Sequence, residues 1–204
     1  MRPGSTVLTG SDDPTTAFFR PFPTEWYDRP TPQVARGLLG QYLVHRRPSG
    51  MQVGRIVETE AYVAGDAANH ASIGPTMRNR AMFGPPGTLY VYRIHQVCLA
   101  NAVTAPGEAV LLRAAEPVDG VDGDPRGPGR LCRAFGIGLE HNRASLIDGP
   151  VRIAPGPGPA GRVLRGTRIG IRRDAQRLLR YAIAGNRWVS RPIRPTSGAR
   201  RALL

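Results

Sequence analysis

Residues 52–63 have the sequence Gln-Val-Gly-Arg-Ile-Val-Glu-Thr-Glu-Ala-Tyr-Val, which predicts a β-strand. Side chains two positions apart lie on the same face of a strand, because successive residues point to opposite sides. One face would carry Ile56, Glu58, Glu60 and Tyr62, and the other face Val53, Val57 and Ala61. Glu58 and Glu60 are therefore expected side by side, roughly 6–7 Å apart along the backbone.

The segments on either side of this strand predict one mixed α/β domain. Thr31-Pro32 begins a predicted helix that ends near Gly40, because proline suits a first helical turn and glycine a C-terminus. A second helix is expected to begin at Gly127. Further strands are expected at residues 88–94, 97–103, 110–115, 168–172 and 181–184, with a long loop at 64–87 and a Gly- and Pro-rich turn region at 155–161.

A length of 204 residues suits a single domain. We expect residues 1–22 to form a flexible arm, residues 23–191 the folded domain, and residues 192–204 a basic C-terminal tail. The sequence has no apolar run of about 18 residues. It also has no apolar signal segment near its start, so a cytoplasmic protein without a membrane contact is expected. The two cysteines, Cys98 and Cys132, are too few for a zinc or iron–sulfur site without other ligands.

The basic residues are unusual, because all 28 are arginines and the sequence contains no lysine. A Walker A phosphate loop, a Schiff-base lysine and a lysine general base are therefore excluded. The formal net charge is +13, and it is concentrated in residues 151–204, where 13 arginines stand against one acidic residue, Asp174. A strongly basic segment of this kind points to a polyanion, most simply a nucleic acid.

The pair Glu58 and Glu60 is the first candidate for chemistry. From the residues alone, it could be a glycosidase-like carboxylate pair, a metal site or part of an ion pair with an arginine. Tyr62, Tyr90 and Tyr92 would supply aromatic walls, and His70 lies in a loop that could fold over them. Two functions other than glycoside hydrolysis are also open at this point. One is a non-catalytic basic nucleic-acid-binding protein, and the other is a metal-dependent nuclease that uses Glu58 and Glu60.

Six motifs in a fixed order carry a resemblance to a known family. They are Arg55-Ile-Val-Glu-Thr-Glu-Ala-Tyr62 with His70, Arg78-Asn-Arg80-Ala-Met-Phe83, Pro86-Gly-Thr-Leu-Tyr-Val-Tyr92, Asn101, Val110-Leu-Leu-Arg-Ala-Ala-Glu-Pro117 and Gly127-Pro-Gly-Arg-Leu-Cys132. From Tyr27 to Arg191 the chain resembles the alkyladenine (3-methyladenine) DNA glycosylases, also called methylpurine DNA glycosylases. The resemblance implies a single domain around a curved antiparallel β-sheet with flanking helices.

The resemblance also implies a site and its residues. Glu60 would be the catalytic general base, and Tyr62, His70, Tyr92, Asn101 and Arg113 would form the pocket for a base rotated out of the duplex. Where the family usually has a wedging tyrosine three residues after Tyr92, this chain has His95, which would intercalate in its place. Arg78, Arg80, Gly129 and Arg130 are expected to contact the DNA backbone.

The function implied is that of a monofunctional base-excision repair enzyme. Its substrates would be alkylated or deaminated purines such as 3-methyladenine, 7-methylguanine, ethenoadenine and hypoxanthine, and a Glu-activated water would hydrolyse the N-glycosidic bond. The expected partner is double-stranded DNA containing damaged purines. No cofactor, no metal and no obligatory protein partner are expected, and the protein would act as a monomer near the bacterial nucleoid.

Overall fold

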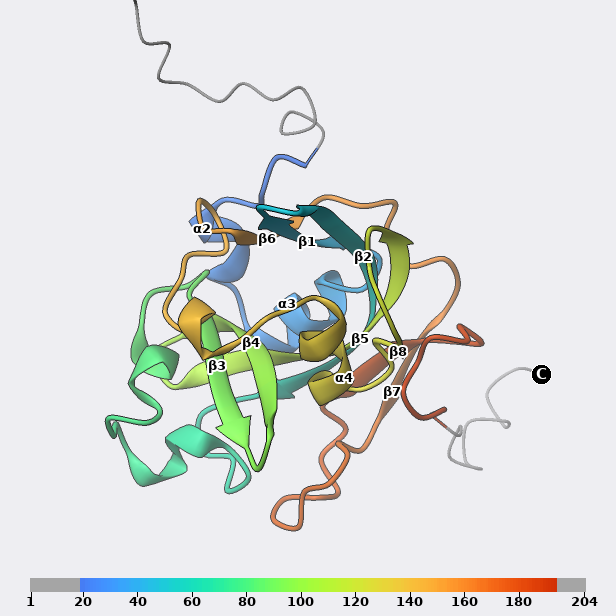
Figure 1. Ribbon diagram of the computed structural model, residues 1–204. Helices are drawn as coiled ribbons and strands as arrows, with labels where there is room; N and C mark the ends of the chain where they lie inside the picture. The colour runs from blue at the N-terminus through green and yellow to red at the C-terminus, as the bar shows by residue number, and fades with distance from the viewer. Residues whose placement is uncertain (1–18, 194–204) are drawn as a thin grey trace, which may run out of the picture.

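The computed structural model describes residues 19–193, shown in Figure 1. The expected arm at 1–22 and the expected tail at 192–204 fall almost entirely outside the described residues.

One antiparallel sheet organises the fold (Figure 1). Its eight strands are β1 (Tyr42–Arg47), β2 (Gly50–Tyr62), β3 (Leu89–Ile94), β4 (Val97–Ala105), β5 (Glu108–Asp119), β6 (Val151–Ala154), β7 (Val163–Gly166) and β8 (Arg180–Ile183). The strand order is β3-β4-β5-β2-β1-β6, and β8 pairs with both β2 and β7. The prediction of a mixed α/β domain around a curved antiparallel sheet is confirmed.

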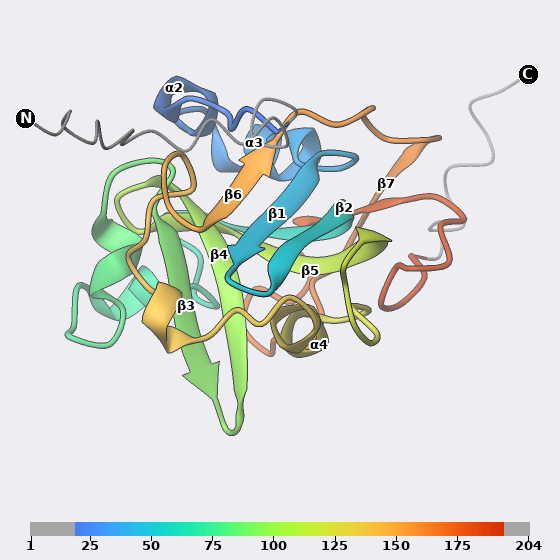
Figure 2. The ribbon, with the colours of Figure 1, turned by 45° about the horizontal axis from the view of Figure 1, so that its top comes forward.

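The helices are short. The described residues form α2 (Thr24–Tyr27), α3 (Thr31–Gly37), α4 (Pro128–Ala134) and the 3-10 turns η1 (His70–Ile73), η2 (Arg80–Phe83) and η3 (Leu139–His141). Helix α3 packs on β2 and β5, and α4 packs on β4 and β5. Figure 2 shows the long strands passing between these two helices. The core between them is apolar and includes Leu38, Leu112, Leu131 and Phe135, all fully buried.

Strand β2 holds a central place because it has neighbours along both edges. Strand β5 pairs with nearly its whole length, whereas β1 pairs with its first half and β8 pairs with residues 58–60. The segment that contains Glu58 and Glu60 is therefore fixed between two strands. Backbone hydrogen bonds on both sides restrict its movement, which suits a segment that carries precisely placed side chains.

The hairpin of β3 and β4 extends beyond the rest of the sheet (Figures 1 and 2). Its strands pair in register from Leu89 opposite Ala102 to Ile94 opposite Val97, so His95 and Gln96 form a two-residue turn. His95 has a φ of 51°, in the left-handed region that a hairpin turn requires at its first central position. The loop at 64–87, which contains η1 and η2, lies beside β3.

The structure agrees with most of the predicted elements and corrects one of them. The expected strand at 168–172 is wrong: the strand lies earlier, at Val163–Gly166. After Gly166 the backbone leaves the sheet, and Gly170 turns it with a φ of 77°. Strands β1 and β6 and helix α2 were not predicted, because their short apolar patterns give little periodic signal.

A buried glycine sets the distance between β2 and α4, and it yields a stability prediction. A Cβ atom on Gly54 would lie 2.6 Å from Phe135 Cζ and 3.1 Å from the Glu116 carbonyl oxygen. We expect Gly54→Ala to lower the free energy of unfolding by about 1–3 kcal/mol, measured by chemical denaturation, because overpacking forces these neighbours apart. The loss should be smaller in a Phe135→Leu background, which lacks the Cζ atom; equal losses in both backgrounds would contradict this account.

Candidate active site

An irregularity in the pairing of β2 with β5 brings three charged side chains together. The register skips Val57 on β2 and then Arg113 on β5, so each strand has one unopposed residue within a few positions. Bulges of this kind redirect side chains and are common beside active sites. Here the Arg113 guanidinium reaches both carboxylates: its Nε lies 3.2 Å from Glu58 Oε1 and its Nη1 lies 3.2 Å from Glu60 Oε2.

Glu58 is a buried structural anion. Besides Arg113, its Oε1 contacts Arg180 Nη1 on β8 at 3.3 Å, and its Oε2 accepts a hydrogen bond from the Ser190 amide at 2.7 Å. Its side chain has no exposed surface. Both carboxylate oxygens therefore contact groups inside the protein. For Glu58, the interpretation as part of an ion pair with an arginine is confirmed.

Glu60 has a different set of partners. Oε1 accepts a hydrogen bond from the Ile169 amide at 2.8 Å, and Oε2 accepts one from the Tyr62 hydroxyl at 3.0 Å. Burial raises the pKa of Glu60 above its ordinary value, while Arg113, the Ile169 amide and the Tyr62 hydroxyl act to lower that pKa. The carboxylate is thus desolvated yet held in place by three donors.

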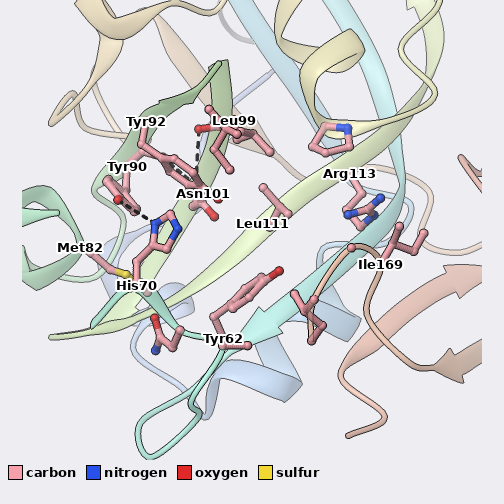
Figure 3. Close-up of a pocket in the computed structure, with 16 residues that line it drawn as sticks. Tyr62, His70, Met82, Tyr90, Tyr92, Leu99, Asn101, Leu111, Arg113 and Ile169 are labelled. Atoms are coloured by element: carbon pink, nitrogen blue, oxygen red, sulfur yellow. Dashed lines mark hydrogen bonds between the residues drawn. The ribbon is translucent and has the colours of Figure 1, made fainter. Parts of the chain in front are cut away.

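A cavity of about 350 Å³ lies directly beside these groups (Figure 3). Its walls include all five of the predicted base-pocket residues: Tyr62, His70, Tyr92, Asn101 and Arg113. Tyr62, Arg113 and Ile169, which contact Glu60, all line it, so the carboxylate lies just behind the cavity surface. The volume is in the range of small-molecule sites and suits a flat ring system.

Aromatic rings form the side of the cavity opposite Tyr62 (Figure 3). Tyr90 and Tyr92 stack with centroids 5.2 Å apart, and the His70 ring lies 4.3 Å from that of Tyr92. His70 Nδ1 is 3.3 Å from the Tyr90 hydroxyl, and burial together with nearby Arg78 lowers the pKa of His70. A neutral imidazole is therefore favoured at this wall, and it can accept or donate a hydrogen bond according to its tautomer.

Asn101 lies at the base of the same cavity on β4. Its Nδ2 donates to the Tyr90 carbonyl oxygen at 3.0 Å, which fixes the orientation of the amide (Figure 3). The side chain is buried. A fixed polar group at the floor of an aromatic cavity can discriminate between ring substituents that reach it.

The residues expected to contact the DNA backbone lie at separate places and do not form one cluster. Arg78 is exposed and donates from Nη2 to the Arg93 carbonyl oxygen at 3.0 Å, next to the β3–β4 hairpin. Arg80 is also exposed but lines a separate hollow with Pro85 and Arg143. Arg130, at the start of α4, lies 3.2 Å from Asp124 in a largely exposed ion pair.

Gly129 and His95 both lie close to Val97, the first residue of β4. Gly129 allows α4 to approach β4, since a Cβ there would be 3.0 Å from Val97 Cβ. Its neighbour Pro128 lines the cavity, so the start of α4 borders the site. His95, at the hairpin tip, is exposed and does not line the cavity. Its exposed position on a protruding hairpin suits contact with a macromolecule rather than with a bound base.

Several residues of the site were not predicted from the sequence. They are Asp66, Arg168, the Ile169 amide, Arg180 and the Ser190 amide. No local signal could have identified them, because Ile169 is 109 positions from Glu60 and Arg168 is 102 positions from Asp66. The sequence assigned the arginines of residues 151–204 to DNA phosphates as a group, but Arg168 and Arg180 are buried in internal ion pairs.

Other kinds of site find little support in residues 19–193. No group of three or more His, Cys, Asp or Glu side chains is arranged there to hold a metal ion. Among the same residues, no helix is long and apolar enough to cross a membrane. Cys132 is buried, and burial raises the pKa of its thiol to about 12, so it is an unreactive core residue; Cys98 is partly exposed.

Fold and site together define a protein with a curved antiparallel sheet, an aromatic pocket and the buried carboxylate of Glu60 behind that pocket. The family model described as methylpurine-DNA glycosylase matches residues 25–187. The chain therefore belongs to the methylpurine-DNA glycosylase family, and it is a DNA glycosylase.

Relatives support the same assignment. The chain is 44% identical over 190 residues to a protein of Methanoculleus marisnigri, covering 83% of this chain and 98% of that protein. It is 45% identical over 188 residues to one of Anaeromyxobacter dehalogenans, covering 87% and 89%. A protein of Rhizobium etli is 42% identical over 184 residues, covering 83% and 88%. Each carries the provisional name 3-methyladenine DNA glycosylase.

The raised pKa of Glu60 predicts a pH-dependent cost in stability. When a carboxyl has a higher pKa in the folded state than in the unfolded state, the protein is most stable below the unfolded-state pKa. It loses that stability as the pH rises through the folded-state pKa. We therefore expect Glu60→Gln to unfold at a higher temperature than the wild type at pH 8, by about 2–4 °C for each kcal/mol regained, and to show a smaller gain at pH 5.

Thermal melts at the two pH values test this expectation. Glu140→Gln is the matched control, because Glu140 is exposed and the charge change is the same. A gain for Glu60→Gln that is equal at both pH values, or a loss at pH 8, would contradict the assigned burial cost.

Proposed function

We propose that the protein excises alkylated or deaminated purines from double-stranded DNA. The damaged nucleotide rotates out of the duplex into the cavity between Tyr62 and the rings of His70 and Tyr92. Glu60 then activates a water molecule that hydrolyses the N-glycosidic bond. The observation that carries this proposal is the Glu60 carboxylate, desolvated and fixed directly behind an aromatic cavity of about 350 Å³.

The contacts of Glu60 leave one acceptor site for a water molecule. A carboxylate has about four acceptor sites, and three donors already contact Glu60: the Tyr62 hydroxyl, the Ile169 amide and Arg113. One acceptor site remains to orient and deprotonate a water as the sugar becomes cation-like. The negative charge would also stabilise that cationic sugar.

The aromatic walls suit the substrates. Purines alkylated at N3 or N7 carry a positive charge, so they leave readily and are attracted to electron-rich tyrosine faces. Neutral lesions such as hypoxanthine and ethenoadenine lack that charge and need protonation or hydrogen bonds to leave. The buried Asn101 amide and the neutral His70 ring offer such contacts at the floor and the wall.

DNA contacts follow from the same proposal. Exposed arginines beside the cavity, such as Arg78 and Arg130, would bind phosphates, and the protein would act as a monomer. His95 at the hairpin tip would fill the gap left by the rotated nucleotide, since such a wedge needs bulk and planarity rather than a hydroxyl group.

Two different observations argue against the two alternative functions. The chain is a DNA glycosylase, so the reading as a non-catalytic binding protein is wrong. For the metal-dependent nuclease, Glu58 and Glu60 would have to be the ligands. Their oxygens are instead compensated by Arg113, Arg180 and backbone amides, which leaves no two free carboxylate edges for a divalent cation.

Replacement of the proposed base is the direct test. Glu60→Gln keeps the shape but removes the proton acceptor, so excision should fall by at least about 100-fold. Binding to lesion-containing DNA should persist or tighten, because a negative charge near DNA is lost. The measurement is single-turnover cleavage of duplexes that each carry one defined lesion, followed by alkaline cleavage at abasic sites.

The control for this test is Glu140→Gln, which should excise like the wild type. If Glu60→Gln cleaves normally and a folded Glu58→Gln is inactive, the general base has been assigned to the wrong glutamate.

The absence of lysine predicts the chemical outcome of the reaction. Enzymes that also nick the strand attack C1′ with an amine and form a Schiff base. This sequence has no lysine to supply that amine. We expect an intact abasic site as product, with strand breaks only after alkali. Borohydride added during turnover should trap less than about 1% of the enzyme on lesion DNA; efficient trapping would show that an amine, and not water, is the nucleophile.

A further inference from the structure

Asp66 and Arg168 form a buried ion pair next to the cavity. Asp66 lies in the loop that follows β2, and Arg168 lies in the segment that follows β7. Arg168 Nη2 donates to Asp66 Oδ1 at 2.9 Å, and Nη1 donates to Asp66 Oδ2, so the pairing is bidentate. Neither side chain has exposed surface. Burial works to raise the pKa of Asp66, but Arg168, the Ala68 amide and Arg177 together lower that pKa below its ordinary value.

The same guanidinium supports Tyr62. Its Cζ lies 4.6 Å from the centroid of the Tyr62 ring, within the range of a cation–π contact, and Nη1 also donates to the Ala61 carbonyl oxygen at 3.2 Å. Arg168 therefore touches the backbone just before Tyr62 and the Tyr62 ring itself. Since Tyr62 also lines the cavity, Arg168 lies behind the ring that a base would stack on.

The next residue along the chain touches Glu60. The Ile169 amide donates to Glu60 Oε1, and Ile169, Gly170 and Ile171 line the cavity. Residues 167–171 belong to no strand or helix, so regular backbone pairing does not hold them there. A second, exposed tie joins the same loops, from the Ala67 amide to Asp174 Oδ2 at 2.8 Å. The buried contact next to Ile169 is the ion pair of Arg168 with Asp66.

We propose that Asp66 and Arg168 are positioning residues: their pair holds residues 168–171 against the end of β2, so that the Ile169 amide stays on Glu60 and the Tyr62 ring stays in the plane needed for stacking. This inference rests on the proposed role of Glu60. Neither side chain touches the reacting atoms. A buried pair is weak evidence for stability, since its desolvation offsets its attraction, and the geometry that it fixes is the better reason for its presence.

The charges around Glu60 determine what loss of Arg168 would do. Glu60 faces Glu58 and Tyr62 from β2, Arg113 from β5, Arg180 from β8, Tyr92 from β3, and Arg168 and the Ile169 amide from the segment after β7. Loss of Arg168 removes a cation and frees the Ile169 amide. Both changes raise the pKa of Glu60, because both remove stabilisation of its anion.

The experiment compares Arg168→Gln with Arg165→Gln. Arg165 is a matched control on β7: it is exposed, it donates to the Leu178 carbonyl oxygen, and its loss changes the charge equally. We measure single-turnover excision of a defined lesion from pH 5 to 9, and hydrogen exchange of the Ile169 amide. In Arg168→Gln we expect the rate to fall by up to about 100-fold, the acidic limb of the pH profile to move to higher pH, and the amide to exchange faster. Arg165→Gln should match the wild type in the position of the acidic limb and in the exchange of the Ile169 amide.

A purely structural role would lower the amount of active enzyme without moving the pH profile. An unchanged acidic limb together with unchanged Ile169 exchange in folded Arg168→Gln would therefore overturn the proposal. If Arg168→Gln does not fold, Asp66→Asn is judged by the exchange of the same amide, which should quicken because one arm of the bidentate pair is lost. Failure of the proposed function is distinguishable: wild-type excision would then not depend on Glu60, whereas the Ile169 exchange would still report on positioning.

Discussion

The buried contact of Arg113 with both Glu58 and Glu60 is the constraint on which the site depends. One guanidinium spans two carboxylates because the pairing of β2 with β5 skips a residue on each strand, which turns Arg113 toward both. The planar fork of arginine presents a separate nitrogen to each carboxylate, Nε to Glu58 and Nη1 to Glu60, whereas a lysine has one ammonium group for both. Arg180 adds a second cation at Glu58. Four desolvated charges thus balance one another inside a sheet whose backbone is fixed along both edges of β2.

The cluster separates two glutamates that look equivalent in the sequence. Glu58 shares Arg113 with Glu60, but its other partners, Arg180 and the Ser190 amide, do not line the cavity. All three partners of Glu60, namely Tyr62, Ile169 and Arg113, line it. The two residues are alternate positions of one strand, and a periodic pattern treats them alike. The difference arises only from what the rest of the chain brings to each of them.

Sequence patterns predicted the parts of the fold that are local. Alternation predicted β2 and β3, and the Thr31-Pro32 start predicted α3, because these signals come from neighbouring residues. The strand at 168–172 was wrong for a non-local reason: the Ile169 amide, which a strand would have paired with another strand, binds Glu60 instead. The basic composition of residues 151–204 likewise indicated phosphate contacts, but composition cannot show that Arg168 and Arg180 face buried carboxylates.

The balance of charge inside the site bears on the proposed binding of a cationic purine by a protein with a formal net charge of +13. Within the described residues, the buried arginines Arg113, Arg168 and Arg180 are compensated by Glu58, Glu60 and Asp66. Exposed arginines outside this buried cluster, such as Arg78, carry positive charge that can attract DNA. In the proposed reaction, a charge-balanced cluster would not repel an alkylated base, and its low dielectric would strengthen the attraction of Glu60 for the positive charge that develops on the sugar. Pairing of the buried arginines would therefore serve the proposed chemistry more than the stability of the fold.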